Sequence, residues 1–153
     1  MAAYTANELL DFAIDREQEA HDFYMDLAGK AEQPDVKNLL RQLAGEELGH
    51  KRKLEEIKSG SRSLPAAQDL TDLKISDYLV DVEPSGKLNY EDALILAMKR
   101  EEAAFSLYTD LAKLAGDEEL KRIFLALAQE EAKHKLHLEM EYKETFLDQG
   151  VKR

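Results

Sequence analysis

The sequence contains two closely matched segments, LAGEELGH at residues 43–50 and LAQEEAKH at residues 127–134. Each carries a Glu-x-x-His motif, formed by Glu47 with His50 and by Glu131 with His134. The intervals 131 − 47 and 134 − 50 are both 84 residues. Residues three apart share one face of an α-helix, so each motif directs a carboxylate and an imidazole to the same side. The repeat therefore predicts two equivalent helices that present polar side chains to a common centre.

The repeat extends to a second pair of helices, because Glu17 and Glu101 are also 84 residues apart. Around both glutamates, apolar residues recur at alternating steps of three and four, which is the spacing of a helix packed in a bundle. Thr5 and Glu8 have the spacing of a capping box, and Asn89 is typical of an N-cap. We expect helices over about residues 5–31, 35–58, 89–115 and 117–148.

The connection over residues 59–89 contains two of the three prolines in the chain, Pro65 and Pro84. It is too long for a tight hairpin and favours a crossover along the length of a bundle, with a short helix around Leu70–Leu79. The sequence thus predicts one all-α domain over residues 1–153. We expect a four-helix bundle made of two repeated helical hairpins joined by a long crossover.

Composition narrows the class of protein. The net charge of −11 disfavours binding to nucleic acids and to anionic membranes. The absence of cysteine excludes disulfides and thiolate metal sites within this chain. The first residues show no signal segment, and no apolar run approaches the ~18 residues of a membrane span. We therefore expect a soluble, cytoplasmic protein.

The charged residues on the apolar helix faces indicate a metal site. An isolated Glu-x-x-His motif is more often part of a solvated helix face. Two copies on apolar faces, each with a partner glutamate, instead favour two cations. Buried carboxylates that share a site repel one another unless cations neutralise them. The predicted ligands are Glu17, Glu47, His50, Glu101, Glu131 and His134.

Other polar residues leave alternatives open. Tyr24 and Tyr108 each follow a ligand glutamate by seven residues, so each is either a core aromatic or a hydrogen-bond donor to a metal-bound carboxylate. His21, one turn after Glu17, either packs beside the core or binds metal. A further set lies off the apolar faces and is expected to be surface charge: Glu46, Glu102 and Glu130.

Over about residues 6–145 the sequence resembles the rubrerythrin branch of the ferritin-like superfamily. The resemblance is carried by residues 16–24, 43–50, 97–108 and 127–134. It implies a ferritin-like bundle in which Glu47 and Glu131 bridge two metals. Glu17 and Glu101 would be terminal ligands, and His50 and His134 would each bind one metal. The family typically holds two iron ions and reduces peroxide or oxygen, although manganese and zinc also suit these ligands.

Two departures from the family qualify this expectation. Full-length rubrerythrins carry a cysteine-ligated rubredoxin-like domain, so here an external electron donor such as a rubredoxin is expected. Ala104 stands where the family has an additional glutamate, which predicts slow peroxidase turnover. We expect a homodimer. The alternative functions are a ferroxidase or iron-handling protein, or a non-enzymatic bundle that metal stabilises.

Overall fold

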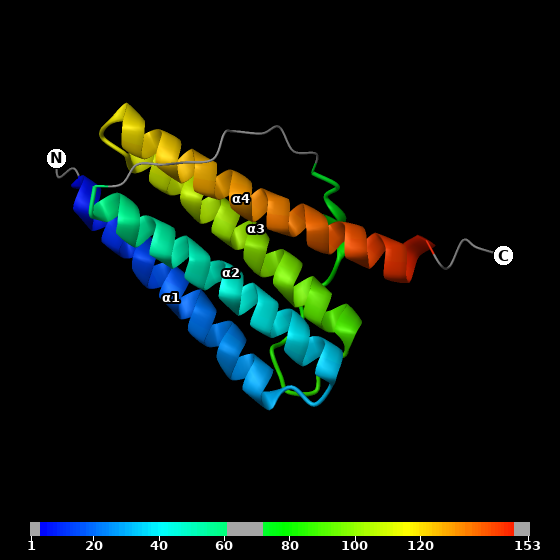
Figure 1. The fold of residues 1–153 in the computed structure, drawn as a ribbon. Helices are drawn as coiled ribbons and strands as arrows, with labels where there is room; N and C mark the ends of the chain where they lie inside the picture. The colour runs from blue at the N-terminus through cyan, green and yellow to red at the C-terminus, as the bar shows by residue number, and fades with distance from the viewer. Residues whose placement is uncertain (1–3, 61–71, 149–153) are drawn as a thin grey trace.

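The computed structural model describes residues 4–60 and 72–148. Four helices of 25 residues each make up most of it: α1 Ala6–Lys30, α2 Pro34–Lys58, α3 Tyr90–Leu114 and α4 Glu118–Tyr142. They lie side by side as a bundle, in which α1 packs on α2 and α3 packs on α4 (Figure 1). No strand occurs in either described range. The predicted all-α bundle of two hairpins is confirmed.

The helices begin where the polar residues of the sequence predict. The backbone N–H of Glu8 donates to Oγ1 of Thr5 at 3.1 Å, and the N–H of Thr5 donates to Oε1 of Glu8 at 2.9 Å. These two bonds form the predicted capping box of α1. Asn89 caps α3 by accepting from the N–H of Asp92 at 2.8 Å. Asp117, which the sequence placed only in a turn, caps α4.

The order of the helices separates the two hairpins. The helix α2 ends beside the start of α1, whereas α3 begins at the opposite end of the bundle (Figure 1). A tight turn cannot join the end of α2 to the start of α3. This arrangement agrees with the predicted long crossover between the two hairpins. The short helix expected around Leu70–Leu79 is correct only in part. The helical turn η1 covers Ile75–Tyr78 alone, and the part of the expected helix before residue 72 lies outside the described residues.

The hydrophobic core consists of two clusters at opposite ends of the bundle. Members of the first include Tyr24, Leu40, Met98 and Leu138. Members of the second include Leu10, Leu54, Phe124 and Leu127. On every helix, the residues of one cluster precede the predicted ligand glutamate and those of the other cluster follow it. The apolar core is therefore interrupted halfway along the bundle by a layer of polar side chains.

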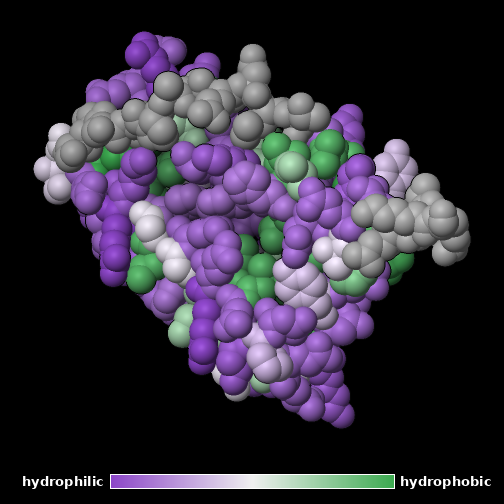
Figure 2. All heavy atoms as spheres, turned by 45° about the vertical axis from the view of Figure 1, so that its right-hand side comes forward, coloured by the Kyte–Doolittle hydropathy of each residue, from purple (hydrophilic) through white to green (hydrophobic). Residues whose placement is uncertain are grey.

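The remaining surface is largely polar. After α4, the chain continues as a π-helical turn, η2, over Lys143–Leu147, so the helical path ends close to the predicted Asp148. Figure 2 shows a mainly hydrophilic face on which hydrophobic side chains form small, separate groups. Within residues 4–60 and 72–148, no helix combines the length and apolarity needed to cross a bilayer. The structural feature that requires explanation is the polar layer inside the core.

Candidate metal centre

All six predicted ligands lie in the polar layer. Each helix contributes at least one of them, and α2 and α4 each contribute a Glu-x-x-His pair from a single face. The four glutamates are 3% exposed or less, and Glu131 is fully buried. His50 is 8% exposed, and His134 is half-buried. Charged side chains are rarely buried to this extent unless they are paired or bind metal.

The six side chains form two overlapping sets of four. Glu17, Glu47, His50 and Glu131 make one set, and the other replaces Glu17 and His50 with Glu101 and His134. Within each set, one potential ligand atom per residue lies within 4.8 Å of the others. Each set contains three carboxylates and one imidazole, and both share Glu47 and Glu131. If each set held one cation, Glu47 and Glu131 would lie between the two positions.

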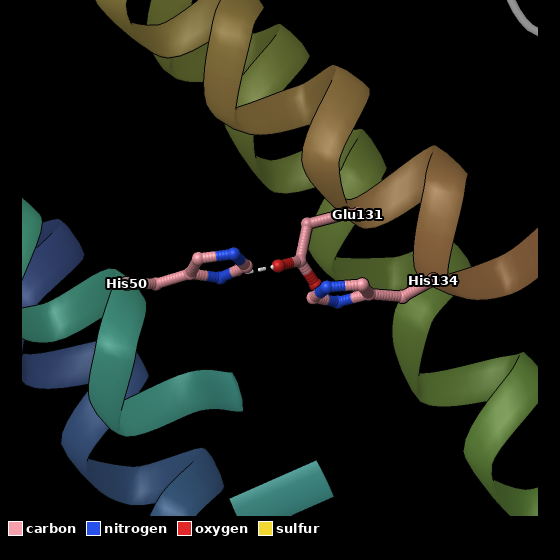
Figure 3. A group of neighbouring side chains, drawn as sticks. All are labelled: His50, Glu131 and His134. Atoms are coloured by element: carbon pink, nitrogen blue, oxygen red, sulfur yellow. Dashed lines mark ion pairs between the residues drawn. The ribbon is translucent and has the colours of Figure 1, made fainter. Parts of the chain in front are cut away.

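Glu131 also lies between the two imidazoles. Figure 3 shows its carboxylate reaching between His50 from α2 and His134 from α4. Oε1 of Glu131 is 2.6 Å from Nδ1 of His50. The two imidazole rings are nearly parallel, with an interplanar angle of 8° and centroids 5.2 Å apart. The motifs of the two hairpins therefore meet at one point, as their equal spacing in the sequence predicts.

Many polar atoms of this layer are buried without a hydrogen-bond partner among the described residues. They include Nδ1 of both histidines, both carboxylate oxygens of Glu101 and Glu131, and one oxygen each of Glu17 and Glu47. Nδ1 of His50 and Oε1 of Glu131 are close enough for an ion pair, but their contact does not have the geometry of a hydrogen bond. Such atoms are uncommon in proteins, and each costs about 1–3 kcal/mol or more when charged. Cations at the two positions would provide partners for these atoms. The donor set therefore fits two metal ions of the kind that carboxylates and imidazoles bind.

The protonation of the glutamates leads to the same conclusion. Burial, followed by the charges of Glu101 and Glu17, raises the pKa of Glu47 from 4.5 to about 11. Burial and the charge of Glu101 likewise raise the pKa of Glu131 well above its usual value. Burial also acts on Glu101, but its contacts with Glu131 and His134 outweigh this effect and lower its pKa. Without cations, the layer therefore retains protons instead of four negative charges.

Tyr24 and Tyr108, expected to be either core aromatics or donors to a metal-bound carboxylate, are both buried, with exposures of 1% and 0%. The hydroxyl of Tyr108 donates a hydrogen bond of 2.5 Å to Oε1 of Glu17. Burial and the charge of Glu17 raise the pKa of Tyr108 well above 10.0. For Tyr24, burial and then the charges of Glu101 and Glu47 raise the pKa. Both phenols therefore remain neutral beside the carboxylates, and Tyr108 is the one for which the described structure shows a hydrogen bond to a ligand glutamate.

For two residues near the layer, Glu46 and His21, the sequence predicted different roles: a surface charge for Glu46, and either packing beside the core or metal binding for His21. Glu46 was expected to be a surface charge, but its Oε2 lies 3.3 Å from Nδ1 of His134 and its side chain is only 28% exposed. Glu46 is on the edge of α2 that faces α4, and the helical seam of α2 alone does not reveal that contact. His21 instead lies 3.2 Å from Oδ1 of Asp22 and belongs to none of the candidate metal-binding groups in the described part of the chain.

A second group of buried polar residues, on the outer side of α3 and α4, was not predicted from the sequence. Lys135 is 5% exposed, and Glu139 and Ser76 are fully buried. Nζ of Lys135 lies 2.8 Å from Asp72 and 3.4 Å from Glu139. The N–H of Ser76 donates to Glu139 at 3.2 Å. The only sequence signal was the spacing of four between Lys135 and Glu139, which is common on exposed helix faces.

Comparison with known proteins agrees with this architecture. An uncharacterized conserved protein from Magnetospirillum magnetotacticum MS-1 has a similar structure, with a TM-score of 0.64 and 25% identity over 93% of this chain and 96% of that chain. A hypothetical protein from Pyrococcus furiosus is 29% identical with a TM-score of 0.57, over 92% of this chain and 89% of that chain. No curated protein matches the sequence. Residues 8–142 match the rubrerythrin family. The chain therefore belongs to the rubrerythrin family.

Proposed function

We propose that this chain binds two iron ions and uses them to reduce peroxide or oxygen with electrons from a separate donor. The observation that carries the proposal is the sharing of Glu47 and Glu131 between two four-residue sets of buried ligand atoms. Four carboxylates balance the charge of two divalent cations, so loading the site removes the repulsion that otherwise keeps Glu47 and Glu131 protonated. Membership of the rubrerythrin family supports iron as the metal.

The side chains have distinct roles in this proposal. Glu47 and Glu131, which belong to both sets of ligand atoms, would help to hold both ions. Glu17 and His50 would complete one position, and Glu101 and His134 would complete the other. When bound, the two ferrous ions supply two electrons and an open coordination position for the substrate.

Tyr108 orients the carboxylate of Glu17, and the surrounding core buries the polar layer. The hydrogen bond from Tyr108 holds one oxygen of Glu17, which leaves the other oxygen for the cation. The two apolar clusters close the layer at both ends of the bundle. Electrostatic interactions are stronger among side chains buried in this way than in water.

Electrons must come from outside the chain in this proposal. The sequence has no cysteine and therefore no rubredoxin-type iron site of its own. Two electrons and two protons reduce one hydrogen peroxide to two waters, so a di-ferrous chain can perform the reaction once. A small reduced electron carrier, such as a rubredoxin, would be required for further turnovers.

Stopped-flow absorbance of the iron-loaded, reduced chain tests this function. Adding peroxide should give one oxidation per two irons, followed by no further reaction until a reduced rubredoxin is supplied. Multiple turnovers with the donor would support an oxidoreductase. Oxidation that is followed by accumulation of many ferric ions per chain would favour iron handling instead. If neither peroxide nor oxygen oxidises the reduced chain, the redox proposal is wrong and a structural role for the metals becomes the better account.

A further inference from the structure

A pocket of about 240 Å³ lies between α1 and α3 and reaches the polar layer. The four ligand glutamates line its most buried part: Glu17, Glu47, Glu101 and Glu131. Each carries at least one buried oxygen without a hydrogen-bond partner among the described residues. The pocket therefore connects the surface with the carboxylates that would hold the metals.

The pocket approaches the layer from the side that lacks the imidazoles. Neither His50 nor His134 is among its lining residues. His134 lines a different hollow, together with Glu46. A molecule in the pocket between α1 and α3 would therefore meet carboxylates first and would not have to displace either histidine.

Small apolar side chains form much of the outer wall. Ala20 on α1 and Ala104 on α3 both line the pocket, and the interval 104 − 20 is again 84 residues. The two alanines therefore hold equivalent positions in the two hairpins, one on each helix. Ala103 and Leu107 extend the apolar wall on α3. This surface suits an organic group better than a string of ordered waters, which need several polar partners each.

Two arginines border the same pocket, and neither fills it as a free cation. The guanidinium of Arg100 lies over the ring of Phe23, with its Cζ 3.7 Å from the ring centroid. The guanidinium of Arg16 pairs with Glu19 at 2.5 Å. These contacts engage both guanidinium groups, and the two arginines line the pocket alongside its apolar wall.

The volume of the pocket shows how large a group it has room for. One water occupies about 30 Å³ in the liquid, and hydrogen peroxide has only one more heavy atom. The pocket is several times larger than peroxide needs. It is also below the roughly 300–1,000 Å³ typical of sites for drug-sized ligands. A compact organic molecule fits between these limits.

We propose that this pocket selects small organic hydroperoxides, with the organic group against Ala20 and Ala104 and the peroxide group directed at the carboxylate layer. The inference rests on the proposed function, because it names the substrate class of the same site. In the reaction, the O–O bond of R–O–O–H breaks. Two electrons from the two ferrous ions and two protons from solvent give the alcohol R–OH and one water.

A binding experiment tests the pocket without any redox reaction. The full chain is loaded with zinc, which is redox-inactive, and titrated with 2-phenyl-2-propanol, the alcohol that forms from cumene hydroperoxide. Amide signals around Ala20 and Ala104 should shift in NMR spectra of the wild type. Ala104→Leu and Ala20→Leu should each abolish the shifts by filling the pocket, whereas Ala104→Ser should retain them. Unchanged metal content and thermal unfolding establish that each variant remains folded.

Stopped-flow oxidation of the iron-loaded chain provides the second test. Each leucine variant should react with cumene hydroperoxide roughly tenfold or more slowly than wild type, as expected for added methyl groups in a small pocket. Its reaction with hydrogen peroxide should slow much less, because peroxide needs only a small part of the pocket, and Ala104→Ser should react with both oxidants at about the wild-type rates.

The two experiments distinguish failure of the proposed redox function from failure of the proposed hydroperoxide pocket. If neither oxidant reacts with any form of the chain, the proposed function fails, and the alcohol titration still decides whether the pocket binds an organic group. The pocket proposal is overturned if the shifted amides lie away from Ala20 and Ala104. It is also overturned if the leucine variants slow both oxidants equally or affect neither.

Discussion

The hydroxyl of Tyr108 on α3 donates a hydrogen bond of 2.5 Å to Oε1 of Glu17 on α1. Both residues are 3% exposed or less, so no water competes for this bond. The bond joins the two hairpins at the polar layer, and it orients a carboxylate whose other oxygen has no hydrogen-bond partner in the described structure. The layer therefore contains buried ligand atoms that have no hydrogen-bond partner among the described residues.

Removing this bond should weaken metal binding. Tyr108→Phe keeps the ring in place but releases Oε1 of Glu17, and loss of a partner that orients a ligand typically lowers metal affinity about 10–100-fold. Titration with ferrous iron or zinc, monitored by calorimetry, measures the change. Tyr78→Phe is the matched control, because Tyr78 is 86% exposed and should bind metal as wild type does. Equal affinities in both variants would contradict an orienting role for Tyr108.

The metal-free chain should lose stability as the pH rises. The pKa of Glu47 is raised from 4.5 to about 11, so the folded state binds a proton that the unfolded state releases. The stability from this proton is fully present below pH 4.5 and falls as the pH rises toward 11. Urea unfolding between pH 5 and 8 should therefore show a falling free energy of unfolding without metal and a much flatter profile with metal. Identical profiles would rule out a buried carboxylate layer.

The second buried group gives a prediction about stability alone. Lys135→Met leaves the fully buried Glu139 without its cation, and breaking a buried ion pair from one side costs roughly 3–5 kcal/mol. The double variant Lys135→Met with Glu139→Leu should recover much of that loss, because neither charge remains. Chemical denaturation measures both. A double variant no more stable than the single one would show that Glu139 does not depend on Lys135.

Gly86 is expected to tolerate no side chain. A Cβ at this position would overlap the backbone oxygen of Lys30, at the end of α1. Gly86→Ala should therefore lower the free energy of unfolding by about 1–3 kcal/mol. The control is Gly45→Ala, whose Cβ meets nothing within 4 Å and which lies inside α2. That variant should be stabilised by up to about 1 kcal/mol, because alanine favours a helix over glycine. The opposite order in thermal unfolding would contradict the close approach of Gly86 to the end of α1.

Local patterns in the sequence were sufficient to predict most of the fold. The capping box of Thr5 and the cap of Asn89 mark two helix starts, because a side-chain oxygen and a nearby N–H determine them. The 84-residue repeat also predicted which side chains meet in the layer, since two equivalent hairpins bring equivalent residues together. These features depend on residues within one helix or on the symmetry between two.

Contacts between elements could not be predicted in the same way. Glu46 lies beside His134 because of how α2 sits against α4, and its position off the apolar seam of α2 suggested only a surface charge. Lys135 and Glu139 are buried partly because η1 packs on α3 and α4 and brings Ser76 to them. The Lys-x-x-x-Glu spacing looks the same whether or not another segment covers it, so burial there requires the tertiary structure.

Anomalous diffraction across the iron edge, on crystals of the full chain purified without added metal, would show whether the polar layer holds two iron ions. We predict two iron peaks in this layer, both in contact with Glu47 and Glu131, with one near His50 and the other near His134. Glu47→Gln and Glu131→Gln should each lose one or both peaks, and the control Glu130→Gln should retain both. A layer without metal, a single peak, or two peaks that survive in both Glu47→Gln and Glu131→Gln would contradict a di-iron centre with these two shared ligands.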